Sequence, residues 1–479
     1  MLSFQETKHG LRLSILDGAF AHIYANLTGG IFLPAFVLLL YASDLTIGLL
    51  ASVPFFSTIS QLIGSLLIEK YQNRKKIAIT FAFISRSFWG LIIFFILILF
   101  DFRPNLLLTL LIILFIIHHI FGSISGVAWL SWMSNLVPAE IRGRFFGFRN
   151  SILGFITIMI TLLGGLFLDW YRISFSAASP ANSFLFLFSL AILAGFISLF
   201  ILTKQPSLEE SNFTPLSLKL LISGPFKNHA FKTMAHFGMV WSFAVNFASP
   251  FFIVYMIRDL QFSYTLVSTV TICSAIADLF GMGFWGHFSD KHGNRPVMII
   301  CVAAGSLLPF IWIFTGNSFL LVYLLIPLLH IAGGFFFAGY NLCSINLLFG
   351  LAPSKNNSMF FALWSIVNGV AAGLGAICGG LFASFLDNLL LYLPFGWISV
   401  FKLVFVLSAI MRLSSIFLLR RVRESRSIPT SGAIRILRSV RTWATTMGYH
   451  PLLQYFLPGK NLRNGSEDEI WPLWVSRKD

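Results

Sequence analysis

Long apolar runs dominate this chain and restrict its fold more than any other feature. Twelve can be drawn between polar breaks, with approximate cores at 13–41, 46–68, 77–100, 106–136, 145–168, 183–203, 233–257, 264–286, 296–315, 319–350, 359–385 and 399–419. A helix needs roughly 20 apolar residues to cross a bilayer. Because an open strand in lipid leaves backbone groups unpaired, we expect every run to be helical. The sequence therefore predicts an all-α integral membrane protein with twelve transmembrane helices.

The composition excludes the other broad classes. Of the 479 residues, 57% are apolar and only 11% are charged, whereas soluble proteins are about 45–50% apolar and about 25% charged. Disordered chains are apolar-poor and charge-rich, which is the opposite pattern. The first apolar run is too long for the core of a cleavable signal peptide, so we expect it to remain as a spanning helix.

The distribution of the net charge of +15 along the chain predicts how the protein is oriented in the membrane. The loops after even-numbered runs and the two tails carry most of the Lys and Arg, while the other loops hold only Arg103, Arg172 and Arg258. This asymmetry predicts that both termini are cytoplasmic in a plasma or inner cell membrane. Nucleic-acid binders instead cluster basic residues on one water-exposed face, so we expect no nucleic-acid partner.

Three segments repeat at nearly constant spacing. Residues 26–32 align with 246–252, residues 65–74 with 286–295, and residues 145–167 with 360–382, at offsets of 220, 221 and 215. Such matches in corresponding helices indicate a six-plus-six duplication with two parallel halves around a central cavity. The predicted units are a first bundle over 1–203, a loop over 204–232, a second bundle over 233–420 and a basic tail over 421–479.

Two loop motifs resemble those of the major facilitator superfamily. Gly286-x-x-x-Asp290-Lys291-x-Gly293-x-Arg295 resembles the family signature between helices eight and nine, and Pro138-Ala-Glu140-Ile-Arg142-Gly143-Arg144 resembles the loop between helices four and five. The resemblance covers about residues 10–425. The first-half signature departs from the pattern, with Ser65, Glu69 and Gln72 replacing Gly, Asp and Gly. The resemblance implies transport of a small solute by alternating access.

The resemblance also implies that charge links close the cytoplasmic side in the outward-facing state. The competing interpretation is an ordinary basic loop that follows the orientation rule. The candidate gate residues are Glu69, Arg74, Arg142, Arg149, Asp290 and Arg295.

Family members line their cavity with helices one, four, seven and ten, so polar residues of these helices are the candidate substrate contacts. Residues spaced by three, four or seven positions share a helical face. A histidine in a membrane helix is, however, more often part of hydrogen-bonded packing than a ligand. The candidates are His22, Asn26, His118, His119, Ser242, Asn246, His330 and Asn341.

Two carboxylates inside the apolar runs are candidates for proton coupling, since ionisable groups are costly within a membrane. Asp17 lies in the first run, and a structural pair with Arg86 is the alternative to a proton site. Asp278 lies in the eighth run, where it can titrate or brace the gate. We expect a neutral or amphipathic solute, because the cavity candidates include no cluster of charges.

No pattern supports an enzyme. His118-His119 lacks the His-Glu-x-x-His metal spacing, and no nucleotide-binding Gly-x-x-x-x-Gly-Lys segment is present. The four cysteines match no metal or disulfide framework, so we expect neither a metal nor another cofactor. A transporter-like receptor or assembly factor remains an alternative to transport. We expect a monomer.

The tail after residue 426 has helical amphipathic spacing. Arg435, Arg438 and Arg441 form one face, opposite a face that begins with Leu437 and Val440. A basic amphipathic helix of this kind is typical of contact with anionic lipids of the inner leaflet.

Overall fold

The computed structural model describes residues 4–138, 141–207, 224–351, 357–390, 399–422, 424 and 429–437. Within these ranges the chain is helical and contains no strand, which confirms the predicted class. The helices are α1 (Phe4–Leu27), α2 (Phe32–Leu39), α3 (Asp44–Ser57), α4 (Gln61–Tyr71), α5 (Arg74–Leu99), α6 (Pro104–Leu136), α7 (Arg142–Ser174), α8 (Ala181–Lys204), α10 (His229–Val254), α11 (Tyr264–His292), α12 (Asn294–Ile311), α13 (Ile326–Leu351), α14 (Asn357–Leu390), α15 (Val400–Leu419) and α16 (Thr430–Leu437).

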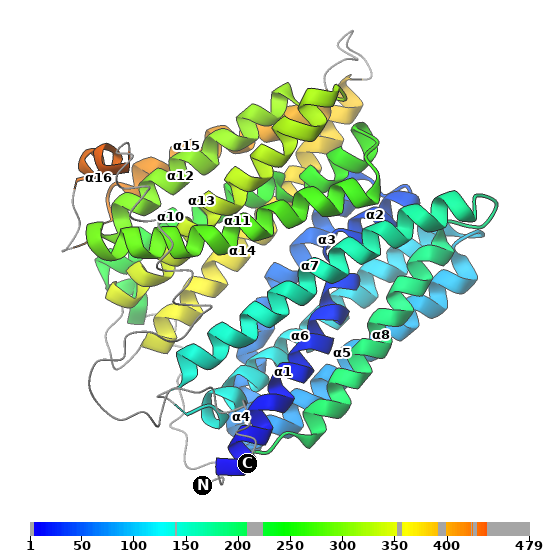
Figure 1. Ribbon diagram of the computed structural model, residues 1–479, viewed down its shortest axis with the longest axis horizontal. Helices are drawn as coiled ribbons and strands as arrows, with labels where there is room; N and C mark the ends of the chain where they lie inside the picture. The colour runs from blue at the N-terminus through cyan, green and yellow to red at the C-terminus, as the bar shows by residue number, and fades with distance from the viewer. Residues whose placement is uncertain are drawn as a thin grey trace, which may run out of the picture.

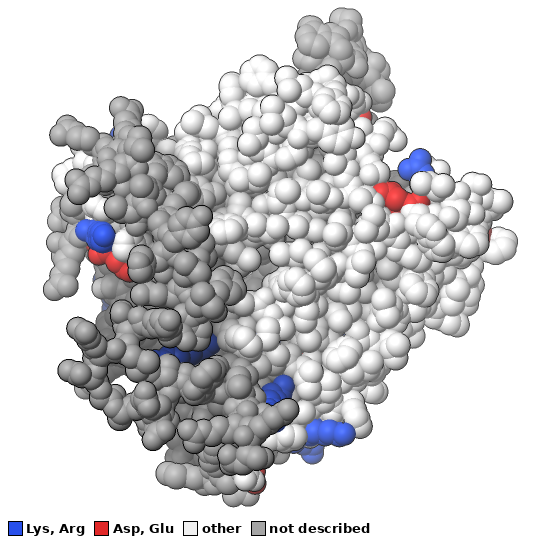
Figure 2. All heavy atoms as spheres, in the orientation of Figure 1, with Lys and Arg blue, Asp and Glu red and all other residues white. Residues whose placement is uncertain are grey.

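Twelve membrane spans, as predicted, are found among the described residues. Several spans contain interruptions of the α-helix, among them a 3-10 turn, Thr58–Ser60, between α3 and α4 and a π-helical turn, Leu321–Leu325, before α13. A break at residues 28–31 separates α1 from α2, where Gly30 takes a positive φ of 48° that glycine tolerates without strain. A π-helical turn, Tyr255–Asp259, continues α10. On the face in Figure 2, charged side chains lie at two opposite ends and leave a broad uncharged area between them.

The helices form two groups that follow the chain order. Helices α1 to α8 pack with one another, as do α10 to α15, and the groups meet through α3 against α14 and α7 against α11. In Figure 1 the groups approach each other beside α2 and α3, and they diverge toward the end where the N-terminus lies. The arrangement matches the six-plus-six duplication predicted from the repeats.

Paired glycines let the groups approach at these contacts. In α7, Gly164 packs on Phe32 of its own half, while Gly165 packs on Tyr264 and Ser268 of the other half. In α14, Gly379 packs on Phe247 of its own half, and Gly380 packs on Asp44 and Leu45 of the other. Each pair therefore serves one contact within a half and one between halves.

Alanine at Gly380 should destabilise the protein, because its Cβ would lie 2.6 Å from the Asp44 carbonyl oxygen. Overpacking of this kind costs about 1–3 kcal/mol. Gly126→Ala in α6 is a matched control, since no atom lies within 4 Å of the added carbon and alanine favours helix by up to about 1 kcal/mol. Thermal unfolding in detergent measures both. Equal melting temperatures of the two variants would contradict the close approach.

Candidate functional site

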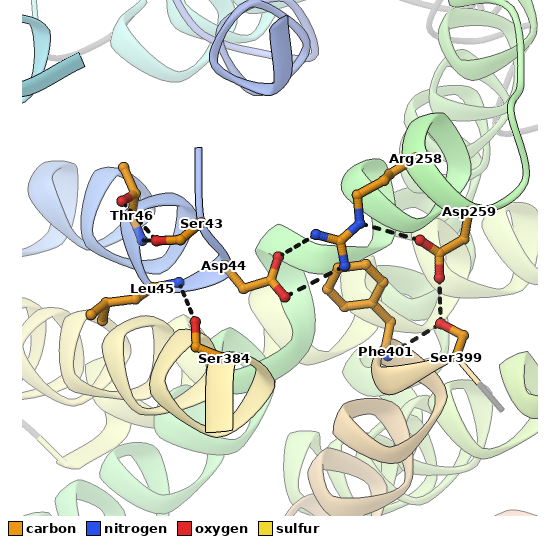
Figure 3. A network of polar contacts seen from close by, with 9 residues as sticks. All are labelled: Ser43, Asp44, Leu45, Thr46, Arg258, Asp259, Ser384, Ser399 and Phe401. Atoms are coloured by element: carbon orange, nitrogen blue, oxygen red, sulfur yellow. Dashed lines mark hydrogen bonds and ion pairs between the residues drawn. The ribbon is translucent and has the colours of Figure 1, made fainter. Parts of the chain in front are cut away.

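The two halves are joined by polar contacts at one end of the bundle, which we call the Asp44 end. Arg258 donates from Nη1 to Oδ1 of Asp44 at 2.9 Å and from Nη2 to Oδ2 at 3.5 Å. The Asp44 side chain is 1% exposed and that of Arg258 is 36% exposed. Figure 3 shows this pair bridging α3 and the turn after α10. A bidentate pair with a buried carboxylate is stronger than an ordinary surface ion pair.

Further contacts in the second half orient Arg258. Its guanidinium lies 4.5 Å from the ring centroid of Phe401, and its Nε is 3.4 Å from Oδ1 of Asp259. Asp259 in turn accepts a 2.5 Å hydrogen bond from Ser399. The sequence offered one signal for this site: Arg258 is among the few basic residues in the odd-numbered loops.

Two helix starts at the Asp44 end are also bound by the opposite half. Asp169, near the end of α7, accepts from the backbone N–H groups of Tyr264 and Thr265 at 3.0 and 2.7 Å. Ser384, near the end of α14, accepts from the N–H of Leu45 at 3.0 Å (Figure 3). None of these contacts was predicted from the sequence.

Between the two ends, α1 and α10 each leave one face partly exposed. In α1 this face carries His22 and Asn26, and in α10 it carries Ser242 and Asn246, with the 220-residue offset of the repeat. Helix α1 packs chiefly on α7 and α8, and α10 packs chiefly on α14 and α15. The exposed faces are thus equivalent surfaces of the two halves.

Neutral hydrogen-bonding groups occupy these faces. His22 lies 3.4 Å from the Thr157 hydroxyl, and Thr161 donates to Oδ1 of Asn26 at 3.1 Å. In the second half, Ser242 donates to Oδ1 of Asn368 at 2.9 Å, and Asn246 donates to the Ser242 carbonyl at 2.9 Å. Thr157, Thr161 and Asn368 were missed by the sequence reasoning, although each is a polar residue within an apolar run.

Of the two histidines of α6, His118 is not on an open face. His118 is 8% exposed and contacts Ser85 at 2.8 Å and the Tyr24 hydroxyl at 3.4 Å, so it belongs to the packing between α1, α5 and α6. This corrects its assignment to the cavity wall. Its neighbour His119 is half-buried, with its ring centroid 4.4 Å from that of Phe115.

The two candidates of α13 differ in their surroundings. Nε2 of His330 is buried and has no hydrogen-bond partner among the described residues, and its ring packs on Trp312. Asn341 is exposed. Asp278 lies midway along α11, half-buried, and its backbone adjoins Gly334 of α13.

A buried charge cluster lies inside the first half. Asp17 is 4% exposed and accepts a short hydrogen bond from Ser198. Arg86 donates to the same serine at 3.1 Å and to the Gly195 carbonyl at 2.6 Å. Arg149 adjoins Gly18 on the other side. Ser198 thus links the Asp17 carboxylate to Arg86, and Arg149 lies close enough to interact with it electrostatically.

The position of Arg149 differs from the prediction of a gate partner. Its Nε donates to the Ser14 carbonyl at 3.1 Å, and its guanidinium lies 4.8 Å from the Trp129 ring centroid. Arg149 is therefore buried within the first half, where the Asp17 carboxylate and the Trp129 ring stabilise its positive charge. Arg142 donates to the Ser134 and Val137 carbonyls at 2.7 and 3.3 Å, which caps the end of α6.

The loop signatures lie at the opposite end of the bundle. Among the described residues, no ion pair joins Glu69 to Arg74 or Asp290 to Arg295. Arg74 instead reaches the Ser131 carbonyl at 3.5 Å, and Arg295 donates to the Arg420 carbonyl at 2.7 Å.

Glu424, after α15, contacts the start of α12. Its carboxylate accepts from the backbone N–H groups of Asn294 and Arg295 at 3.0 and 2.8 Å. Helix α16 then packs on α12 through the buried Ala433. Glu424 therefore caps the start of α12, where the second loop signature ends. The remainder of the predicted amphipathic segment, including Arg438 and Arg441, lies outside the described residues.

The second half also buries an arginine, but with carbonyl partners. Arg412 is 4% exposed and donates to the carbonyls of Gly305 and Val245, both at 3.2 Å. Pro309 in α12 lacks the N–H that would bind the Gly305 carbonyl. Arg412 thus supplies the donor that the proline removes, and it joins α10 to α12.

The comparisons with known proteins agree with this architecture. A sequence profile described as Major Facilitator Superfamily matches residues 18–254 and again 237–460, whereas a search of curated proteins gave no match. A solved bacterial homolog of the human lysosomal transporter Spinster, inward-facing and occupied, aligns with a TM-score of 0.67 at 13% identity over 89% of this chain and 100% of that one. The nucleoside transporter NupG gives 0.63 at 16% over 87% and 98%, and a D-xylose-proton symporter gives 0.59 at 14% over 88% and 98%. At these identities the likeness concerns the fold.

Proposed function

The chain belongs to the major facilitator superfamily, and from this membership we propose that it moves a small uncharged solute by alternating access between its two halves. It is a multi-pass membrane transporter, as the family match and the twelve spans together establish. The alternative of a receptor or assembly factor without transport is not favoured, because the similar solved structures are those of transporters.

The matched polar faces of α1 and α10 carry the proposal about the solute. They present an imidazole, amides and hydroxyls from His22, Asn26, Ser242 and Asn246, backed by partners on α7 and α14. Such groups recognise a solute by hydrogen bonds to hydroxyl or amide groups. A carboxylate pair or cluster of cations would instead favour an ionic solute.

The distribution of basic residues supports an orientation with both termini in the cytoplasm of a plasma or inner cell membrane. In that orientation the Asp44 end is extracytoplasmic, and the conformation described here is closed to the outside. Glu69, Arg74, Arg142, Asp290 and Arg295 then lie at the cytoplasmic end, where they are proposed to close that side in the opposite conformation. We further propose a monomer whose basic tail contacts anionic lipids.

Proton coupling is proposed through Asp17, with Asp278 as the second candidate. Asp17 is supported by its burial within the first half, its link to Arg86 through Ser198 and its electrostatic interaction with Arg149. Protonation of this carboxylate would leave two guanidiniums unbalanced, so proton binding would change the packing of α1 against α5, α7 and α8.

Thermal-shift screening of the purified protein against neutral polar solutes, followed by uptake of any hit into vesicles, tests the function. Asn26→Ala and Asn246→Ala should each raise the half-saturating concentration roughly 3- to 10-fold, since a hydrogen bond contributes about 0.5–1.5 kcal/mol. Ser87→Ala on α5, whose hydroxyl donates to the Phe83 carbonyl of its own helix, should leave it unchanged. A folded protein that binds solutes but never moves them would overturn the proposal.

A further inference from the structure

The contacts of Asp169 and Ser384 occupy equivalent positions in the two halves. Asp169 and Ser384 are 215 residues apart, the offset of the repeat in α7 and α14. Leu45 and Thr265, whose N–H groups they bind, are 220 apart, as in the repeat of the first helices. The same contact thus forms twice, and each half supplies an acceptor to the other.

The bound groups are first-turn amides of helices α3 and α11. The first N–H groups of any helix lack partners within it. Each helix caps one of them from its own half, because Ser43 accepts from Thr46 N at 3.3 Å and Ser263 accepts from Leu266 N at 3.2 Å. Ser384 and Asp169 bind earlier amides of the same turns, so complete capping requires both halves to be in contact.

We propose that Asp169 and Ser384 are gating residues that hold the Asp44 end closed by capping helices of the opposite half. This rests on the proposed alternating access, in which that end must open. When the halves separate there, both helix starts lose their cap and their amides turn to water. The gate is therefore a pair of hydrogen-bonded helix starts as well as the Asp44–Arg258 ion pair.

The two caps are unequal in strength. Asp169 accepts two hydrogen bonds with a carboxylate, and a negative charge is favoured at a helix N-terminus. Ser384 accepts one bond with a neutral hydroxyl. Loss of Asp169 should accordingly open the end more than loss of Ser384.

Distances between probes across the Asp44 end test the proposal without any solute. Probes at Tyr41 in the turn after α2 and at Phe319 in the helical turn before Leu321, which are 91% and 79% exposed in opposite halves, report its opening once the native cysteines are replaced. Asp169→Ala should raise the ratio of open to closed molecules roughly tenfold and Ser384→Ala roughly threefold. The first change removes hydrogen bonds to a charged carboxylate, and the second removes one hydrogen bond to a neutral hydroxyl, which contributes less. Asp169→Asn, which keeps one acceptor, should fall between them and serves if the alanine variant fails to fold.

Ser263→Ala is the matched control, because it removes a cap of the same helix that comes from its own half. It should speed hydrogen exchange in the first turn of α11 and leave the probe distances unchanged. Unchanged distances in folded Asp169→Ala and Asp169→Asn, or an equal opening in Ser263→Ala, would overturn the proposal. If the caps respond as expected but no solute moves, the gate stands and the transport proposal fails.

Discussion

Arg258→Gln should shift the protein strongly away from the closed Asp44 end. It leaves the buried Asp44 carboxylate without its cation, and breaking a fully buried pair in this way costs about 3–5 kcal/mol. Because Arg258 is 36% exposed, we expect a smaller loss of about 1–3 kcal/mol, which is still roughly a 5- to 150-fold change in the population of the closed state. Probe distances across the end measure it.

The double variant Asp44→Asn/Arg258→Gln is the control for this experiment. If the cost of the single change comes from an uncompensated carboxylate, the double variant should close better than Arg258→Gln alone. Arg258→Lys should be intermediate, since it retains charge but not the two-pronged geometry. A double variant as open as Arg258→Gln would show that the cost comes from the lost contacts of Arg258 and not from an uncompensated Asp44 carboxylate.

Asp17→Ala should cause the largest loss of stability among single substitutions in the first half. It removes the negative charge that interacts with the buried Arg86 and Arg149, together with the acceptor of the Ser198 hydroxyl that links Asp17 to Arg86. Removing one partner of a buried charge network costs about 3–5 kcal/mol. Thermal unfolding in detergent measures the loss, and a variant as stable as the parent would contradict the arrangement.

Asp17→Asn separates the structural role of this carboxylate from proton coupling. The amide keeps an acceptor for Ser198 but cannot exchange a proton, so some stability should return relative to alanine. If Asp17 couples the proton, folded Asp17→Asn should equilibrate solute across vesicles yet fail to accumulate it against a gradient. Undiminished proton-driven accumulation would leave Asp17 a structural role only.

The sequence predicted the spans, the duplication and the family because these depend on local composition and on repeated patterns. Twenty apolar residues in succession allow few alternatives in a membrane, and the positions of Gly164, Gly165, Gly379 and Gly380 repeat at one offset. The break at Gly30 and the π-helical turn before Leu260 were not predicted, since the surrounding apolar runs continue through both.

The polar network was predicted less well, because it depends on which helices touch. His118 was placed on a cavity wall by its helix number, but its contacts with Ser85 and Tyr24 bury it. Arg149 was read as part of a loop, whereas its stem extends into the bundle to Ser14. Asp169 and Ser384 are at equivalent positions yet differ in residue type, so a search for identical residues passes over them.

The contact of Glu424 with the start of α12 decides where this chain tolerates being cut or fused. A chain end before residue 424 would remove the acceptor for the Asn294 and Arg295 amides, and it would remove α16 from the surface of α12. A protease site or fluorescent fusion placed after Leu437 would keep both. Glu424 and α16 therefore belong to the folded unit of the second half.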